Sequence, residues 1–455
     1  MQIQSMDIGA MNVNDTICAI STPHGVGGIA VIRVSGTDAL PVTQKIWKGR
    51  RLTDMKTHTA HFGHVTTESG APLDQAVLTV FRGPGSYTGE DIVEISVHGS
   101  VYVQERLLQA LCASGARLAE PGEYTRRAFA AAKIDLIQAE SIADILSART
   151  EAAHTLAMAQ LRGGVSDTIN NLRQKLIDLA ALLELELDFS EEDVEFASRQ
   201  SLIRTAEEVC RQVNSLHDSF RTGDAIKNGI PIAITGPTNA GKSSLLNALT
   251  GDDRAIVSDI HGTTRDIVED TIIIGGTAFR LMDTAGLRET DDPIELLGIE
   301  RSRNALNKAM IILDVQSPDT NVIPTGDTPI DTPVIHIHNK CDLLERLPVN
   351  TDSDIYISTK TGQGIDVLRQ ALKRMTDRML DVADTTPISN LRHRETLAAA
   401  AKTAAEVLEA LRADLPGVLV AQPLRETIRH LSTLTGAITD STLLQTIFSR
   451  YCIGK

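Results

Sequence analysis

The sequence lacks the features that mark disulfide-bonded, membrane-spanning or secreted proteins. Its five cysteines are odd in number, far apart along the chain and without the spacing of metal ligands: Cys18, Cys112, Cys210, Cys341 and Cys452. This usage favours a reducing, cytoplasmic setting over a disulfide framework. No run of about eighteen uncharged apolar residues occurs, so we predict no membrane span. The first residues contain no basic region followed by an apolar run, so we predict no signal peptide.

Aromatic residues are few, and the net charge is negative. Phe, Trp and Tyr make up 3% of the chain, Trp47 is the one tryptophan, and the formal net charge is -15. An acidic chain does not attract polyphosphate through its net charge, so contact with nucleic acid requires a local basic patch or a partner protein. The composition, 42% hydrophobic and 23% charged, is that of a protein with buried cores. At roughly 100–200 residues per domain, the chain length suggests two to four domains.

The first part of the chain alternates short apolar runs with turns. Between residue 14 and about residue 130, "GGIAVIRVSG", "QAVLTVFRGP" and "EDIVEISVHG" are typical of strands bounded by glycine and proline. The segment "VQERLLQALCASG" is typical of a helix. We therefore expect an α+β domain in this part of the chain.

Long helical stretches follow from about residue 133. Leucines recur there at spacings of three and four, which places them on one helix face: Leu172, Leu176, Leu179, Leu183 and Leu187. After residue 387, "TLAAAAKTAAEVLEALR" and "PLRETIRHLSTLTG" are amphipathic as well. Neither set of helices buries its apolar face alone, so we expect the two sets to pack together.

Between these helical stretches, residues 229 to about 378 alternate strands with helices. The runs "IPIAIT", "AFRLMD", "MIILDV", "PVIHIH" and "DIYIST" suit a mostly parallel sheet with crossover helices. "TIIIGGTAFRLMD" predicts a hairpin with Gly275-Gly276 at its turn. The simplest reading is that a nucleotide-binding module is inserted into a helical domain.

A phosphate-binding loop begins this module. "GPTNAGKS" (Gly236 to Ser243) fits G-x-x-x-x-G-K-[ST], follows a predicted strand and precedes a predicted helix, as the motif requires. Glycines let backbone N–H groups surround the phosphates. Lys242 is then expected to reach the β- and γ-phosphates and Ser243 to bind magnesium.

Four further segments follow in the order typical of a GTP-hydrolysing switch. "GTTRD" contains Thr264, expected to complete the magnesium shell, and "DTAG" supplies Asp283 near the magnesium and the Gly286 amide for the γ-phosphate. "NKCD" selects the base, because a carboxylate at Asp342 accepts two hydrogen bonds from guanine that adenine cannot donate. "STK" (residues 358–360) is placed to read guanine O6.

One expected side chain is missing from this set. Many such proteins place a glutamine directly after DTAG to orient the attacking water. Here that position is Leu287, which neither donates nor accepts a hydrogen bond through its side chain. Hydrolysis therefore requires another group.

Outside the GTPase motifs, the sequence contains "DTICAISTPHGVGGIAVIRVSG", "GPGSYTGEDIVE", "PGEYTRRAFAAAKIDLIQAE" and the terminal "CIGK". Through these segments and the GTPase motifs, nearly the whole sequence resembles the MnmE (TrmE) family of bacterial tRNA-uridine modification GTPases. The resemblance implies a multidomain α/β plus α fold in three parts. These are an α+β tetrahydrofolate-binding and dimerisation domain (1–132), an all-α helical domain (133–228 and 379–455) and an inserted Ras-like P-loop α/β G domain (229–378).

The resemblance also implies an activity and its partners. With an FAD-containing partner, MnmG (GidA), the family modifies carbon 5 of the wobble uridine of certain tRNAs to aminomethyl or carboxymethylaminomethyl forms. The one-carbon unit comes from a tetrahydrofolate derivative, 5-formyl or 5,10-methylene. Each chain would bind GTP, Mg²⁺ and K⁺, would form a homodimer, and would work in the cytoplasm with no membrane contact.

For Leu287 the resemblance implies a potassium ion, bound beside the phosphates when two G domains pair. Its implied ligands are Asn239, Ser258, Ile260 and Thr263, and Glu295 would orient the water through a water chain. A cation held by amide and main-chain oxygens can offset charge developing between the β- and γ-phosphates. The implied nucleotide and ion contacts are Asn239, Ala240, Gly241, Lys242, Ser243, Ser244, Ser258, Asp259, Ile260, His261, Gly262, Thr263, Thr264, Asp283, Thr284, Ala285, Gly286, Asn339, Lys340, Asp342, Ser358, Thr359 and Lys360.

The implied folate contacts are Arg33, Glu94, Lys133 and the terminal Lys455. Basic groups suit the glutamate tail of a folate, and a carboxylate suits the N–H donors of its pterin. Cys452 is a candidate reactive thiol, although a small apolar cap on the last helix is an equal alternative.

Two other functions remain open from the sequence. One is an Era-like GTPase that assists ribosome assembly without chemistry on RNA, which would lack the N-terminal block and "CIGK". The other is a folate-dependent transferase with a regulatory GTPase.

Overall fold

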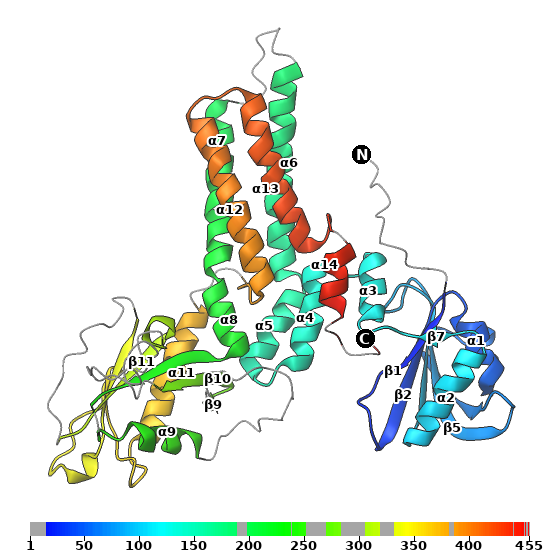
Figure 1. Cartoon of the computed structure of the whole chain (residues 1–455), viewed down its shortest axis with the longest axis horizontal. Helices are drawn as coiled ribbons and strands as arrows, with labels where there is room; N and C mark the ends of the chain where they lie inside the picture. The colour runs from blue at the N-terminus through cyan, green and yellow to red at the C-terminus, as the bar shows by residue number, and fades with distance from the viewer. Residues whose placement is uncertain are drawn as a thin grey trace, which may run out of the picture. The chain divides into compact units, whose positions relative to one another are not determined.

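The computed structural model describes residues 15–188, 198–237, 239–251, 270–283, 305–318, 332–381, 386–439, 441–449, 451 and 454. The chain forms two compact units. The first comprises residues 1–143, 169–173 and 429–455, and the second comprises residues 144–168 and 174–428. Each is considered by itself (Figure 1). Among the described residues, no helix combines the length and the apolar character needed to cross a membrane.

The first unit is built on a seven-stranded sheet with the order β3-β4-β5-β6-β2-β1-β7. Neighbouring strands are antiparallel except β1 and β7, which are parallel. The strands are β1 (Ile17–Ile20), β2 (Gly27–Ser35), β3 (Trp47–Lys48), β4 (Thr59–Thr66), β5 (Pro72–Phe81), β6 (Ile92–Gly99) and β7 (Arg117–Leu118). The three predicted strands in this region are confirmed as β2, β5 and β6, and the predicted helix as α2 (Val101–Ala113).

One face of this sheet forms the core of the unit. Alternate residues of β4 and β5, such as Val65, Ala76 and Leu78, pack with residues of α1 (Ala39–Ile46) and α2. The period of two along a strand turns the residues between them, such as Phe62 and Val77, to the other face. The short helix η1 (Leu52–Asp54) adds Leu52 to the same core.

A second, smaller core brings the end of the chain to the first unit. Helices α3 (Glu123–Ala130) and α4 (Leu136–Ser147) pack through Phe129 and Leu136 against Phe448 of α14 (Ser441–Phe448). Beyond α14, the hydroxyl of Ser21 donates to the carbonyl of Gly454 at 3.3 Å. Gly454 therefore lies beside the end of strand β1.

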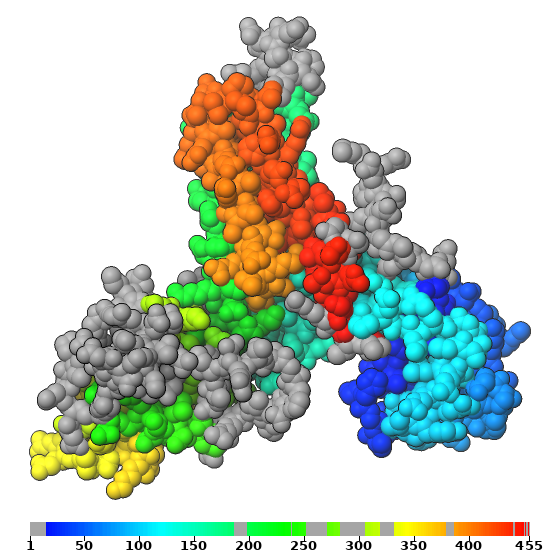
Figure 2. Space-filling model, viewed as in Figure 1, coloured from blue at the N-terminus to red at the C-terminus, as the bar shows by residue number. Residues whose placement is uncertain are grey.

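The second unit contains most of a helical bundle. Figure 1 shows α6, α7, α12 and α13 running side by side, and in Figure 2 the orange and red-orange surfaces of α12 and α13 meet directly. Ion pairs join α6 to α7 (Lys175–Glu208, 2.7 Å) and α7 to α12 (Glu207–Arg412, 2.6 Å). Helices from before and after the central segment thus pack together, as expected. The helices are α5 (Glu151–Leu161), α6 (Gly164–Asp188), α7 (Arg199–Asp218), α8 (Phe220–Asn228), α12 (Leu391–Arg412) and α13 (Gly417–Thr435).

The predicted leucine face of α6 is confirmed for four of its positions, because Leu172, Leu176, Leu179 and Leu183 are buried. Helix α13 differs from the segment expected from its sequence. It begins at Gly417, six residues before Pro423, which lies inside the helix. Proline lacks the N–H that would bond to residue i−4, but packing outweighs that local loss here.

The central segment of the second unit is a six-stranded sheet with the order β13-β12-β11-β8-β10-β9. All neighbours are parallel except β9 and β10, which form the predicted hairpin with Gly275-Gly276 at its turn. The five predicted runs are confirmed as strands. The elements are β8 (Ile230–Thr235), α9 (Lys242–Thr250), β9 (Asp270–Ile274), β10 (Thr277–Asp283), β11 (Ile311–Gln316), β12 (Val334–His338), η2 (Cys341–Leu343), β13 (Asp354–Tyr356) and α11 (Ile365–Asp381).

Candidate functional site

The phosphate loop connects the central strand β8 to helix α9. Every residue of β8 is buried, and the loop begins where the strand ends, at Gly236. Gly236 has φ +131°, and a Cβ there would collide with the carbonyl of Val315. Gly241 has φ +98° and leaves no room for a Cβ beside the Asn339 amide. Both positions require glycine because their backbone conformation and their neighbours exclude a side chain.

Lys242 turns back over its own loop. Its ammonium group donates to the carbonyl oxygens of Gly236 at 2.7 Å and Pro237 at 3.0 Å. Ser243 and Ser244 lie exposed in the first turn of α9. The positive group, the helix N-terminus and the serine hydroxyls therefore converge where the motif places the phosphates.

A base-reading loop lies beside the phosphate loop. The side chain of Asn339 is buried; its amide donates to the carbonyl of Ala240 at 2.9 Å and its oxygen accepts from the N–H of Thr359 at 3.2 Å. Asn339 thus ties together three predicted segments: the phosphate loop, NKCD and STK. Lys340 follows with φ +60°, a left-handed conformation that turns the chain into η2.

Asp342 is held as an exposed carboxylate. The hydroxyl of buried Ser358 donates to its Oδ1 at 2.6 Å, and the N–H of Thr361 donates to the Ser358 hydroxyl at 3.2 Å. This hydrogen bond from Ser358 lowers the pKa of Asp342, and Lys360 lowers it further. The group is therefore ionised at neutral pH and has acceptor capacity left for the two guanine donors.

The structure also places the first residue of DTAG. Strand β10 ends at Asp283, which is paired with Ile234 of β8 in parallel register. The phosphate loop and the DTAG segment therefore leave neighbouring strands at the same edge of the sheet. Ligands bind at this edge in open α/β sheets.

Several predicted residues lie outside the described residues. They are the switch residues Ser258, Asp259, Ile260, His261, Gly262, Thr263 and Thr264; the residues Thr284, Ala285, Gly286, Leu287 and Glu295; and the C-terminal Cys452 and Lys455. Their roles stay predictions. Asn239 is described, with φ +64° in the phosphate loop.

Two of the predicted folate residues are neighbours on the sheet of the first unit. Arg33 of β2 and Glu94 of β6 are direct cross-strand partners and form an ion pair of 2.8 Å. The Arg33 guanidinium lies 5.6 Å from the ring centroids of both Tyr87 and Tyr124, and the Tyr124 hydroxyl donates to the Arg33 carbonyl at 2.7 Å. The sequence analysis assigned Arg33 to the glutamate tail of the folate and Glu94 to its pterin. In the structure the two side chains form an ion pair with each other.

Lys133 reaches the same neighbourhood through a loop. Its ammonium donates to the carbonyl of Pro84 at 2.7 Å, three residues before Tyr87. Gly454 lies beside Ser21 at the end of β1, and β1 pairs with β2 through Ala19 and Arg33. Lys133 is thus linked to Arg33 through the loop that carries Tyr87, and Gly454 lies beside β1, the strand next to β2.

Sequence reasoning missed two residues that contact the predicted site residues. Tyr87 occurs in "GPGSYTGEDIVE", and its aromatic ring in a glycine-rich loop was an available signal. Gln316, whose backbone carbonyl accepts from the Asn339 N–H at 2.8 Å, carried none, because that contact depends on the register of β11 and β12.

The sheet order, the glycine-rich loop before α9 and the Asn339–Asp342 base loop define a P-loop GTPase domain, and the chain is a GTPase. Comparison with known proteins defines the family. A model described as the GTP-binding protein TrmE N-terminus matches residues 16–133, and one described as the MnmE helical domain matches residues 136–452. The chain belongs to the MnmE family.

Individual relatives match nearly the whole chain. The tRNA modification GTPase MnmE of Cytophaga hutchinsonii is 43% identical over 454 residues, which cover 98% of each chain. That of Parabacteroides distasonis is 45% identical over 459 residues, which cover 97% of this chain and 100% of the relative. Among solved structures, the chain is similar to Aquifex aeolicus Era, with 24% identity and a TM-score of 0.27 over 38% of this chain and 65% of that one.

Proposed function

We propose that this GTPase takes part in tRNA modification, changing carbon 5 of the wobble uridine together with an FAD-containing MnmG partner. The observation that carries the proposal is 43–45% identity, over nearly the whole length, to relatives named tRNA modification GTPase MnmE. The family models also match the N-terminal and helical parts of the chain. An assembly GTPase of the Era type does not require those parts. The working site is the cytoplasm.

In this proposal GTP binds with its phosphates over the loop of residues 236–243 and its base against Asp342 and a backbone amide of the segment 358–360. Magnesium is held by the hydroxyls of Ser243 and Thr264 with Asp283 nearby. The exposure of Ser243 at the start of α9 supports this, because a buried hydroxyl could not reach a phosphate-bound ion.

Hydrolysis in this proposal depends on potassium. Asn239, Ser258, Ile260 and Thr263 hold the ion, and Glu295 orients water through a chain of waters. The place of Asn239 inside the phosphate-loop motif supports its part, because the ion is expected beside the phosphates. The ion compensates for the absence of a polar side chain at Leu287.

The first unit in this proposal binds a tetrahydrofolate carrying a 5-formyl or 5,10-methylene group. Arg33, Glu94, Lys133 and Lys455 bind it, and Cys452 is the candidate reactive thiol. The convergence of Arg33, Glu94, Lys133 and the Gly454 backbone within one unit supports this site. Glu94 and the arginine beside it offer an acceptor and a donor, as a pterin edge requires.

We also propose a homodimer formed through residues 1–132, with a helical domain (133–228 and 379–455) and the G domain (229–378) beyond it. Phe62 and Val77 face one another across β4 and β5 and are 66% and 42% exposed. They lie on the sheet face opposite the one that α1 and α2 cover. A second copy of the chain would remove this apolar surface from water.

The experiment that tests the proposal is mass spectrometry of total tRNA nucleosides from a strain lacking this protein. The aminomethyl and carboxymethylaminomethyl uridines should disappear and return when the parent chain is supplied. A control chain with Lys242→Ala should fail to restore them. Normal levels of these nucleosides in the deletion strain would contradict the proposed role.

A further inference from the structure

One loop contacts two of the proposed folate-binding residues. Residues 83–91 connect β5 to β6, and we call them the 83–91 loop. Its Tyr87 ring lies 5.6 Å from the Arg33 guanidinium, and its Pro84 carbonyl accepts from Lys133 at 2.7 Å. The position of this loop therefore affects where both basic groups lie.

The apolar packing of the loop comes from Tyr87, whose ring packs against a small cluster that includes Ile17 and Tyr124. Its buried residues are Ser86 and Thr88, and both carry hydroxyl groups. Tyr87 is half-buried, and its hydroxyl hydrogen-bonds to Thr125 at 2.9 Å. Outside Tyr87, the conformation of the loop therefore depends on polar contacts.

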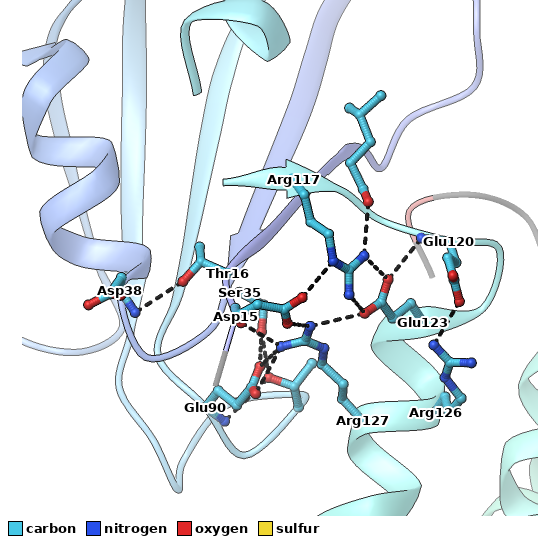
Figure 3. Close-up of polar contacts among 12 residues, drawn as sticks. Asp15, Thr16, Ser35, Asp38, Glu90, Arg117, Glu120, Glu123, Arg126 and Arg127 are labelled. Carbon is cyan, nitrogen blue, oxygen red and sulfur yellow. Dashed lines mark hydrogen bonds and ion pairs between the residues drawn. The ribbon is translucent and has the colours of Figure 1, made fainter. Parts of the chain in front are cut away.

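The strongest of these contacts is at Glu90, near the end of the loop. Its carboxylate pairs with Arg127 of α3 at 3.0 Å and accepts from the hydroxyl of Ser35 at 2.8 Å. Ser35 is also hydrogen-bonded to Thr88 at 2.8 Å. Arg127 and the end of β2 thus hold the loop from two sides (Figure 3).

Arg127 is itself fixed by a network of charges. Its guanidinium pairs with Asp15 at 2.5 Å and with Glu123 at 2.9 Å, and Arg117 pairs with both of those carboxylates. Figure 3 shows the two arginines between the three carboxylates. Arg127 is 5% exposed and Glu123 is fully buried.

The network keeps these groups charged although they are out of water. Burial alone raises the pKa of Glu123, but hydrogen bonds from Arg117, the Glu120 N–H and Arg127 lower the pKa to about 2. Burial lowers the pKa of Arg127, and the facing carboxylate of Glu90, with Glu123 and Asp15, raises it. Removing one partner leaves an uncompensated buried charge, so the remaining groups must rearrange.

We propose that Arg127 is a positioning residue for the one-carbon folate site: by holding Glu90 it sets the 83–91 loop, and through Tyr87 and Pro84 it sets Arg33 and Lys133. The inference rests on the proposed folate binding of the first unit. Arg127 acts through the loop and has no contact with the ligand in this assignment.

The test measures binding of 5-formyltetrahydrofolate to the full-length chain by calorimetry, with hydrogen exchange of the 83–91 loop as a second readout. Arg127→Gln should weaken binding by roughly 10- to 100-fold, the effect of losing hydrogen bonds to a buried charge. Exchange should rise in the loop while β5 and β6 stay protected. Arg127→Lys, which keeps the charge beside Glu90, should recover part of the affinity.

Two further variants complete the design. Glu90→Gln removes the charge of the other member of the pair and should give the same pattern of binding and exchange. It replaces Arg127→Gln in the test when that variant does not fold. Arg126→Gln is the matched control, since Arg126 pairs with the largely exposed Glu120 at 2.9 Å, and it should bind like the parent. Binding by Arg127→Gln within twofold of the parent, or exchange that rises across β5 and β6 as well, would overturn the positioning role alone. A parent chain that does not bind the folate would overturn the proposed site together with it.

Discussion

Asp342 shows how a single exposed carboxylate is prepared for base recognition. Ser358 donates to one of its oxygens at 2.6 Å, and this keeps the pKa of Asp342 low. A carboxylate accepts from both the N1–H and the exocyclic amine of guanine. An asparagine would present an amide donor to one of these two donors, so it satisfies only one of them.

Asp342→Asn should therefore lower GTP affinity by roughly 100-fold, because one guanine donor loses its acceptor and meets a second donor. Xanthosine triphosphate, which carries an oxygen in place of that amine, should bind the variant better than it binds the parent. Competition binding of GTP, XTP and ATP measures this. Asp366→Asn, exposed in the first turn of α11, is the control. An unchanged ratio of GTP to ATP affinity in Asp342→Asn would refute the role of this residue.

At the scale of the elements, the β8–α9 connection depends on backbone that only glycine can adopt. Gly236→Ala places a Cβ against the Val315 carbonyl at φ +131°. We expect a loss of roughly 2–4 kcal/mol in stability around the loop and no measurable GTP binding. Gly251→Ala is the matched control at the other end of α9, where φ is -52° and the nearest atom lies 3.5 Å away. Thermal unfolding with and without GTP checks both variants, and GTP-induced stabilisation of Gly236→Ala would contradict the prediction.

The elements also show which features the sequence predicts and which it does not. Period and turn chemistry predicted β8, β10 and β11 and the Gly275-Gly276 hairpin, because those signals are local. The start of α13 was missed, since Pro423 is a local stop signal that tertiary packing overrides. The motif residues around Asn339 were predicted one by one. Their mutual hydrogen bonds follow from the order of the strands in the sheet, which no local pattern contains.

The same limit applies to the first unit. Arg33 and Glu94 are 61 positions apart, and their ion pair exists because β2 and β6 are neighbours in one particular register. The Arg127 network likewise joins residues up to 112 positions apart. Resemblance to a family identified the ligand-binding candidates but not these supporting contacts, because charged residues in a sequence do not reveal which opposite charge they meet.

At the scale of the whole molecule, the proposed mechanism needs two chains. The described part of the nucleotide site offers Lys242 and the phosphate loop, while the position after DTAG is Leu287, which cannot orient water through its side chain. A monovalent cation bound between paired modules would supply the missing positive charge only when both copies meet. GTP turnover should then depend on the cation and on protein concentration together.

Replacing sodium by potassium at constant ionic strength should therefore raise GTP turnover by at least about tenfold, as expected for a positive charge placed on the transition state. Asn239→Gly keeps the left-handed backbone at φ +64° and removes the amide oxygen, so it should bind GTP but lose the potassium response. Steady-state GTP turnover is measured in the two salts across a range of protein concentrations. This distinguishes the effect of the ion on turnover from the effect of G-domain pairing. Equal rates in sodium and potassium would exclude the cation, and a potassium response that survives in Asn239→Gly would exclude this residue as its ligand.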